Sequence, residues 1–253
     1  DAHPSAPAPV SALLSGVLIK VLGVFALVRV IFTLFHRADV FLDLLALLGI
    51  LSILLGAVLA LAQWDYKRLL AYSSISQVGY IILGIGIGTP LGVMGALLHM
   101  LNHGVFKSLL FLNAGAVEYR LGTRDIREMG GLENRMPLTS TSAIFGFLSL
   151  AGVPPLNGFW SKLFIILAAI QVGANGYAVI AALASVITLG YALKVMKQAF
   201  FGELNTKWEN VREIPWTMGG ALVFLSILCV VMGLGIGVLL DELVIPAVDM
   251  LFL

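Results

Sequence analysis

The sequence predicts an all-helical membrane protein with about seven transmembrane helices, one of them broken in the middle of the membrane. Hydrophobic residues make up 60% of the 253 positions and charged residues 11%, whereas a soluble domain carries roughly 25% charged residues. The mean hydropathy is +1.02. The apolar residues occur in runs of about 20 or more, the length that a helix needs to cross a hydrocarbon core of about 30 Å. Most turns between the runs are short, which predicts antiparallel neighbours in one bundle.

Seven apolar runs define the expected spans, and a single transmembrane domain at residues 10–240 contains them all. A loop at residues 1–9 enters the membrane, and a C-terminal tail occupies residues 241–253. The first residues lack the basic start and apolar core of a signal peptide and are typical of a loop between helices. The spans are expected at residues 10–35, 41–62, 69–88, 91–117, 138–172, 177–201 and 216–240.

Basic residues are concentrated in alternate loops, and the turns that follow Gly88 and Val172 carry none. The positive-inside rule therefore predicts that the basic loops face the cytoplasm of a cell (inner) membrane. The same rule places the N-terminus of this chain inside and the acidic tail, with Asp241 and Glu242, outside. The odd number of spans agrees with this orientation. The basic loop residues are Lys67, Arg68, Arg120, Arg124, Arg127, Arg135, Lys207 and Arg212.

The fifth run, residues 138–172, is too long for one straight helix. Its middle reads Gly-Val-Pro-Pro-Leu-Asn-Gly, in which Pro154 and Pro155 remove amide donors and Gly158 loosens the backbone, so we expect a broken helix. Breaks at membrane depth tend to mark ion or substrate pathways, because free backbone groups need protein or water around them. A proline kink without function is the structural alternative.

Two lysines lie deep inside apolar spans. Lys20 sits ten residues into the first run, and Lys162 follows the Pro-Pro pair by seven residues. An ionisable group at the bilayer centre costs roughly 2.5 to 3.5 kcal/mol on insertion scales, so both are expected to face a cavity or a partner rather than lipid. Lys162 is also expected to lie beside the loosened backbone of the break.

Three titratable residues are spaced four apart on one span, namely His99, His103 and Lys107. On a helix each lies about 6 Å along the axis from the last and about 40° around it, so they form one stripe. Histidine, with an ordinary pKa of about 6.5, both accepts and donates protons near neutral pH. The stripe therefore predicts part of a proton wire. The structural alternative is that these side chains only hydrogen-bond neighbouring helices.

Asp65 and Lys67 lie in the turn between the second and third runs and are secondary candidates. Topology alone explains a basic residue there, and the functional alternative is gating or contact with another subunit. Cys229 is the single cysteine and lies in an apolar run, so we expect no disulfide, no metal site and no cofactor in this chain. A net charge of +1 argues against a nucleic-acid partner.

Five segments of the sequence resemble a known family. They are DAHPSAPAPVSALLSGVLIK at residues 1–20, DYKRLLAYSSISQVGY at 65–80, HMLNHGVFKSLLFLNAGAV at 99–117, TRDIREMGGL at 123–132 and GVPPLNGFWSK at 152–162. These segments are similar to the antiporter-like subunits shared by respiratory complex I, Mrp cation/proton antiporters and membrane-bound hydrogenases. The resemblance extends from the first residue to about residue 202, in the order that the family shows.

The resemblance implies two inverted five-helix repeats with a broken helix in each, of which this chain is similar to the second half. It would then be a fragment of a longer subunit or a subunit split into two chains. In that family protons are thought to move along lysines, histidines and water at mid-membrane. Matched by position, Lys20 resembles the lysine that joins the two half-channels, His99 and His103 the central histidines, Lys107 their neighbour and Lys162 the lysine of the second broken helix. Gln77 stands where some members have histidine.

We therefore expect a proton-translocating or cation/proton-antiporting subunit of a multisubunit complex, with a relay formed by Lys20, His99, His103, Lys107 and Lys162. The expected partners are other membrane subunits, including further antiporter-like subunits, a peripheral iron–sulfur redox arm and the lipid bilayer. The chain would carry no redox centre of its own, even within a redox-driven translocase of NADH dehydrogenase or hydrogenase type. The alternatives are an Mrp-type Na⁺/H⁺ antiporter subunit uncoupled from redox chemistry, and a membrane anchor that conducts no ions.

Overall fold

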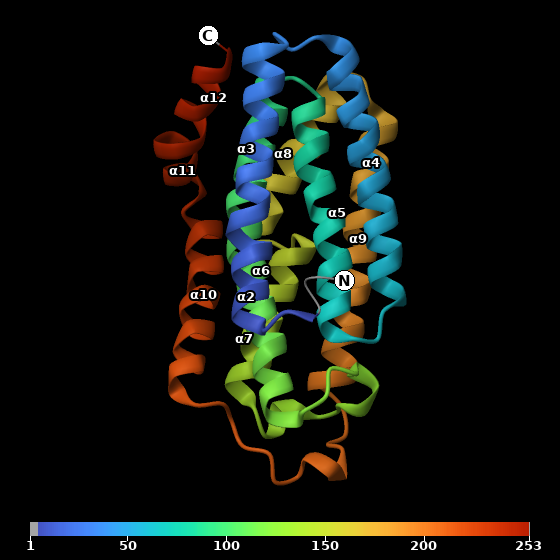
Figure 1. The fold of residues 1–253 in the computed structure, drawn as a ribbon, viewed down its shortest axis with the longest axis vertical. Helices are drawn as coiled ribbons and strands as arrows, with labels where there is room; N and C mark the ends of the chain where they lie inside the picture. The colour runs from blue at the N-terminus through green and yellow to red at the C-terminus, as the bar shows by residue number, and fades with distance from the viewer. Residues whose placement is uncertain (1–4, 253) are drawn as a thin grey trace.

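The computed structural model describes residues 5–252, except the side chains of residues 17–20, and shows an elongated bundle of long helices (Figure 1). No strand occurs among the described residues, and the pairing of Asp65 with Asp125 is an isolated bridge. The all-helical fold that the composition predicts is therefore confirmed.

The long helices run antiparallel, and short turns join many of them. The first segment is a continuous helical rod, Ala8–Leu34, that contains α2 and α3. In chain order the helices are α2 (Ala8–Leu13), α3 (Ile19–Arg29), α4 (Asp39–Ala62), α5 (Tyr66–Gly86), α6 (Pro90–Leu121), α7 (Pro137–Ala151), α8 (Asn157–Gln171), α9 (Asn175–Val195), α10 (Trp216–Leu234), α11 (Ile236–Leu239) and α12 (Ile245–Phe252).

Five helices within the described residues are long and apolar enough to cross a membrane by themselves. The 32 residues of α6 give it a length of about 48 Å, although its polar residues make it less apolar than those five. The helices α7 and α8 have 15 residues each and together occupy the span expected to be broken. The five self-sufficient spans are Ala8–Leu34, Asp39–Ala62, Tyr66–Gly86, Asn175–Phe200 and Trp216–Leu234.

The C-terminal tail expected after residue 240 is helical. After α10 ends, α11, a π-helical turn at Leu240–Val244 and α12 continue along the outside of the bundle (Figure 1). The ring of Phe252 packs edge-on against Phe32 with centroids 5.4 Å apart. This contact ties the end of the chain to the end of the first helical rod.

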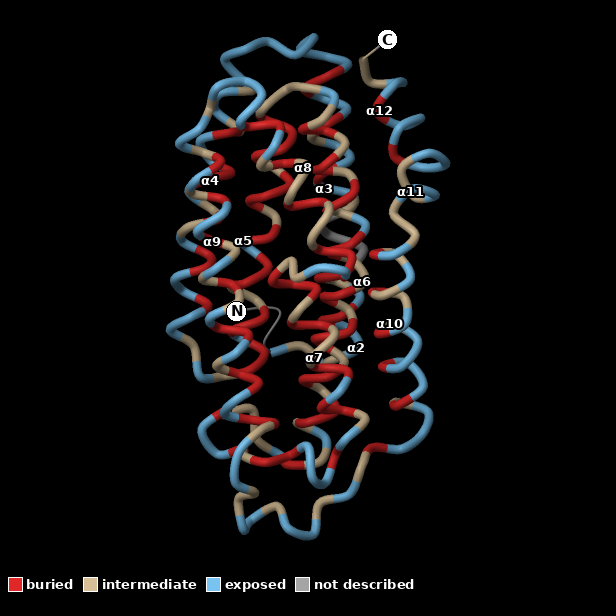
Figure 2. The backbone as a smooth tube through the Cα atoms, turned by 180° about the vertical axis from the view of Figure 1, so that it is seen from behind, coloured by how far each residue is buried: buried red, intermediate tan, exposed pale blue. Residues whose placement is uncertain are grey.

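The helix α6 is the centre of the bundle, since it packs against α2, α5, α7, α8 and α10. Buried residues face inward on α5, α6, α7 and α8, whereas the outer sides of α4, α9 and α10 are exposed (Figure 2). The helices α4 and α5 approach closely, because a Cβ atom at Gly49 or Gly79 would meet the backbone of the other helix. Small residues at such contacts are typical of helix pairs in membranes.

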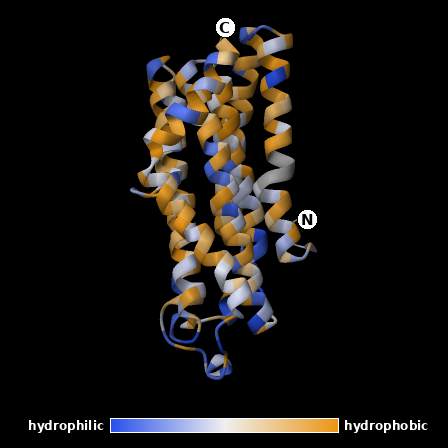
Figure 3. Cartoon of the chain, turned by 90° about the vertical axis from the view of Figure 1, so that its left-hand side faces the viewer, coloured by the Kyte–Doolittle hydropathy of each residue, from blue (hydrophilic) through white to orange (hydrophobic). Residues whose placement is uncertain are grey.

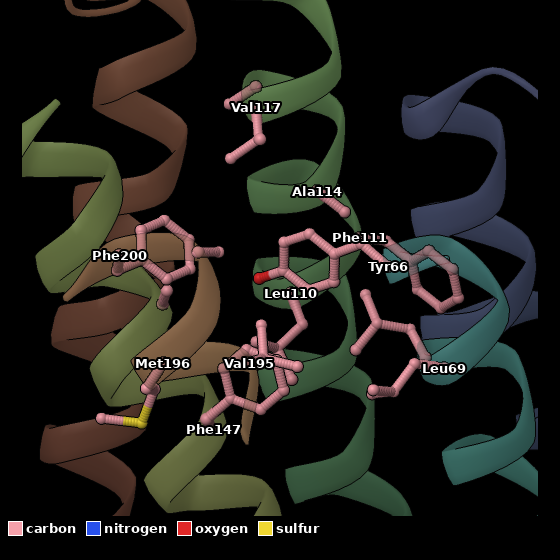
Figure 4. Close-up of a cluster of buried hydrophobic side chains, with 14 of the residues drawn as sticks. Tyr66, Leu69, Leu110, Phe111, Ala114, Val117, Phe147, Val195, Met196 and Phe200 are labelled. Atoms are coloured by element: carbon pink, nitrogen blue, oxygen red, sulfur yellow. The ribbon is translucent and has the colours of Figure 1, made fainter. Parts of the chain in front are cut away.

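Aromatic side chains form part of a buried hydrophobic cluster in the core (Figure 4). The ring of Tyr66 stacks on Phe147 at a centroid distance of 5.9 Å and meets Phe200 edge-on at 6.4 Å. The Tyr66 hydroxyl donates a hydrogen bond of 2.9 Å to Asn113 Oδ1. These contacts fix the relative positions of α5, α6, α7 and the end of the α9 rod, below the level of the helix break.

The predicted broken helix is confirmed. The helix α7 ends at Ala151, and the next residue, Gly152, has a φ of 83°, the left-handed conformation that favours glycine at a helix C-terminus. The peptide bond between Pro154 and Pro155 is cis, and α8 begins at Asn157. Gly158 packs against the carbonyl oxygen of Ser149 with no room for a Cβ atom. The two half-helices are therefore held in close contact at the break.

The loops at 122–136 and 201–215 gather at the lower end of the bundle, where hydrophilic residues are concentrated (Figures 1 and 3). The side chains of Asn205 and Trp208 both donate to the carbonyl oxygen of Glu128, at 3.0 and 2.8 Å. In the same region, Arg127 binds both carboxylate oxygens of Asp125. This ion pair lowers the pKa of Asp125 below its usual range.

Candidate functional site

The polar face of α6 lies inside the bundle rather than against lipid. His99, Asn102, His103 and Lys107 are at most 1% exposed. Thr89 caps the start of α6 by accepting a hydrogen bond from the amide of Gly92, which fixes the first turn of the helix. The three titratable residues expected to form one stripe therefore do share a buried helix.

His99 joins three helices through its ring nitrogens. Nδ1 lies 2.8 Å from the hydroxyl oxygen of Ser161 on α8, and Nε2 lies 3.2 Å from Gln77 Oε1 on α5. Its ring is also 5.7 Å from the ring of Tyr80, measured between centroids. Which nitrogen carries the proton depends on the tautomer. The imidazole therefore connects α6 to both α5 and α8.

Lys107, about two turns further along α6, also reaches α5. Its Nζ donates to the hydroxyl oxygen of Ser73 at 2.5 Å and to the carbonyl oxygen of Leu70 at 3.0 Å. His103 lies between His99 and Lys107 on α6, and its ring meets Phe106 edge-on at 5.5 Å. His99 and Lys107 therefore both reach α5, although they lie about 12 Å apart along α6.

Lys162 lies at the helix break, as the sequence predicts. Its Nζ donates to the carbonyl oxygens of Leu150 at 2.8 Å and Ala151 at 3.3 Å, which are free because α7 ends there. The same ammonium lies 4.8 Å from the centre of the Tyr80 ring. The side chain is 3% exposed, so the negative end of α7 and an aromatic face replace water around it.

Asn102 connects α6 to the start of α8. Its Nδ2 donates to the carbonyl oxygen of Asn157 at 2.8 Å and to Ser161 Oγ at 3.3 Å. Ser161 therefore contacts both His99 and Asn102. Lys162 follows Ser161 in the chain and is close enough to His99 for the two charges to interact. The helix break thus brings the α6 stripe and Lys162 into one buried polar region.

The secondary candidates lie at the basic end of the bundle. Asp65 caps α5 by accepting from the amide of Arg68 at 2.8 Å, which is a structural role. Lys67 is 3% exposed and pairs with Glu118 at 2.6 Å. Glu118 lies 3.7 Å from Arg124. A cavity of about 420 Å³ opens over the Lys67–Glu118 pair.

Sequence reasoning named Gln77 on α5 and Lys162 on α8, but it missed the uncharged side chains that α5, α8 and α9 contribute beside them. Ser73, Tyr80, Ser161 and Tyr191 are uncharged residues in apolar helices, and no spacing rule singled them out. The backbone of Lys20 lies in α3, but its side chain falls outside the described residues. Its expected role in the relay therefore stays a prediction.

A broken span that carries buried lysine and histidine residues is typical of ion pathways in membrane transporters. Residues 1–188 match the family described as NADH:quinone oxidoreductase/Mrp antiporter, TM. The chain belongs to this family of antiporter-like membrane subunits, as its motifs indicate.

Relatives and solved structures support this assignment. The chain is 38% identical to Hydrogenase-4 component B of Escherichia coli (strain K12), over 92% of this chain and 38% of that protein. A chain of the Mrp complex from Dietzia sp. DQ12-45-1b superposes with a TM-score of 0.93 at 27% identity, covering 99% of this chain and 55% of that one. A chain of respiratory complex I from Thermus thermophilus gives 0.87 at 31% identity, covering 97% and 51%. The chain thus spans about half or less of the length of the relatives that it matches.

Proposed function

We propose that this chain conducts protons within an ion-translocating membrane subunit, along the buried residues of α5, α6 and α8. The observation that carries the proposal is a buried polar region in which His99 and Lys162 lie at the helix break and Lys107 lies further along α6. Each nitrogen has a polar partner on a neighbouring helix within 3.3 Å. Such groups are costly at membrane depth and are characteristic of proton pathways.

Repulsion between charges supplies a physical basis for transfer. A protonated His99 and a charged Lys162 repel each other through a poorly screened interior, so a proton arriving at one favours release from the other. The Tyr80 ring lies near both residues, 5.7 Å from the His99 ring and 4.8 Å from the Lys162 ammonium. This arrangement can pass protons along the bundle with no chemical change other than proton transfer. A change in a neighbouring subunit that shifts either charge would drive the exchange.

The structural alternative is that Lys162 only caps α7 and that the chain is an anchor. The chain offers a matched control for this alternative, because Lys194 also donates to two carbonyl oxygens at a helix end, those of Leu61 and Gln63 at 2.9 and 2.8 Å. Lys194 lies outside the polar region of the break.

Proton flux into membrane vesicles that contain the complete complex tests the proposal. Lys162→Ala is expected to abolish flux at equal assembly, and Lys194→Ala is expected to retain it. Unchanged flux in Lys162→Ala would refute conduction and support the anchor. Vesicles allow the comparison to be made per assembled complex, so a loss of protein is not mistaken for a loss of transport.

We place the chain in a multisubunit complex of a cell (inner) membrane, beside other antiporter-like subunits. In this orientation the basic end, with Lys67 and Arg124, faces the cytoplasm. A peripheral iron–sulfur arm would supply any redox chemistry, and this chain would hold no cofactor. Copurification of iron–sulfur proteins with the complex tests that coupling.

Exchange of Na⁺ for H⁺ without redox chemistry is the second candidate function. The TM-score of 0.93 with a chain of the Mrp complex favours it. The same vesicles distinguish the two functions. Proton movement driven by an imposed Na⁺ gradient, with no electron donor present, would support antiport. Movement that requires an electron donor would support a redox-driven pump.

A further inference from the structure

Lys107 and His99 reach α5 at two positions one helical turn apart. Lys107 binds Ser73, and His99 binds Gln77. Ser73 and Gln77 lie four residues apart, which is about 6 Å along α5 and on the same face. A proton that moves between Lys107 and His99 through α5 must therefore cross the gap between these two side chains.

The side chain of Tyr191 on α9 lies next to both of these α5 side chains. It is 0% exposed, and its hydroxyl lies beside the side chains of Ser73, Gln77 and Thr188. The hydroxyl forms no hydrogen bond of standard geometry with any of them. A buried hydroxyl in this position keeps both its donor and its acceptor capacity for a transient partner. Its three neighbours include the α5 residues that hold Lys107 and His99.

We propose that Tyr191 is a proton-relay residue that links His99 to Lys107 through Ser73. This inference rests on the proposed function, because it assigns a route within the same conducting region. Gln77 is a poor carrier by itself, since an amide does not readily gain and lose a proton at neutral pH. It is suited instead to holding one water molecule between His99 and the Tyr191 hydroxyl.

Along this route one proton passes from protonated His99 to the neutral amine of Lys107. The Nε2–H bond of His99 breaks, and the proton passes through the water to the oxygen of Tyr191. Tyr191 gives its own hydroxyl proton to Ser73, and Ser73 gives its hydroxyl proton to Nζ of Lys107. Both hydroxyl groups remain neutral, His99 becomes neutral and Lys107 becomes an ammonium. Ser73 must first turn its hydroxyl away from the carbonyl oxygen of Leu70, to which it donates at 2.9 Å.

A direct route along α6 through His103 is the competing geometry. It needs no group from α9, so it predicts that the Tyr191 hydroxyl can be removed without effect on transport. The route through Tyr191 predicts that removing this hydroxyl lowers transport. The two routes therefore differ in the result of one conservative substitution, which deletes a single oxygen atom and keeps the ring that packs in the core.

Proton flux per assembled complex in membrane vesicles is the test. We expect Tyr191→Phe to lower flux about a hundredfold or more, the lower end of the range for a positioned proton-transfer group. The matched control is Tyr177→Phe on the same helix, which should retain flux. Wild-type flux in Tyr191→Phe together with no flux in Lys162→Ala would overturn the Tyr191 route and leave the proposed function standing. Unchanged flux in both variants would overturn both.

A second variant separates the hydroxyl from the packing of the ring. Replacement of Tyr191 by 3-fluorotyrosine keeps the hydroxyl and adds one small atom to the ring. It should restore most of the flux that Tyr191→Phe loses. Flux as low as that of Tyr191→Phe, at equal assembly, would show that the site responds to packing alone and would overturn the relay assignment.

Discussion

Replacing Lys162 tests whether the helix break serves conduction or only architecture. The ammonium group holds two carbonyl oxygens at the end of α7 and is buried. Lys162→Ala removes the charge and both donors. Lys162→Gln removes the charge but keeps an N–H donor on a shorter side chain. The two variants therefore differ in capping and agree in being unable to carry a proton.

The structure sets the size of each effect. A buried acceptor that loses its donor costs about 1–3 kcal/mol, so leaving the carbonyl oxygens of Leu150 and Ala151 bare costs Lys162→Ala about 2–6 kcal/mol of stability. Lys162→Gln, which can still satisfy one acceptor, should lose about half of that. The flux should fall by about a hundredfold or more in both variants, because a positioned proton-transfer group contributes about 10²–10⁴-fold.

Two measurements, one on the purified complex and one on vesicles that contain it, separate these effects. Thermal unfolding of the purified complex reports the capping cost, and initial proton flux per complex reports conduction. We expect stability to follow the order wild type, Lys162→Gln, Lys162→Ala, while both variants lack flux. Wild-type flux in a fully assembled Lys162→Gln complex would refute the reasoning, because capping alone would then explain the lysine.

Three further predictions concern architecture. Gly158→Ala should prevent assembly, measured by native gel electrophoresis, because its Cβ would overlap a carbonyl oxygen of α7. Tyr66→Phe should lower thermal stability by about 1–3 kcal/mol, because Asn113 Oδ1 loses its donor; unchanged stability would contradict this. Arg127 lowers the pKa of Asp125. The ion pair therefore stabilises the folded loop at pH values above the ordinary aspartate pKa of about 3.9. That support is lost as pH falls through the lowered pKa. Hydrogen exchange at 122–136 should therefore respond to Arg127→Ala at pH 5 and lose that response in strong acid.

The sequence by itself determined the membrane class, the approximate spans and the broken helix. Long apolar runs have few alternatives to spanning helices, because hydrocarbon offers no partner to an open backbone. The Pro-Pro-Leu-Asn-Gly segment interrupts the fifth run for reasons that are local to the chain. The lysines and histidines also stood out without a structure, since a charge in an apolar run is rare.

Only the tertiary structure decided which side chains meet these charges. The stripe of His99, His103 and Lys107 was predicted from helical spacing, but the spacing on α6 says nothing about its neighbours. Ser161 reaches His99 because the break redirects α8, and Tyr191 lies beside Ser73 because α9 packs across α5. Lys67 was explained by topology alone, yet it is buried against Glu118. Partners depend on how each helix is rotated within the bundle, and that rotation is set by the packing of all the helices together.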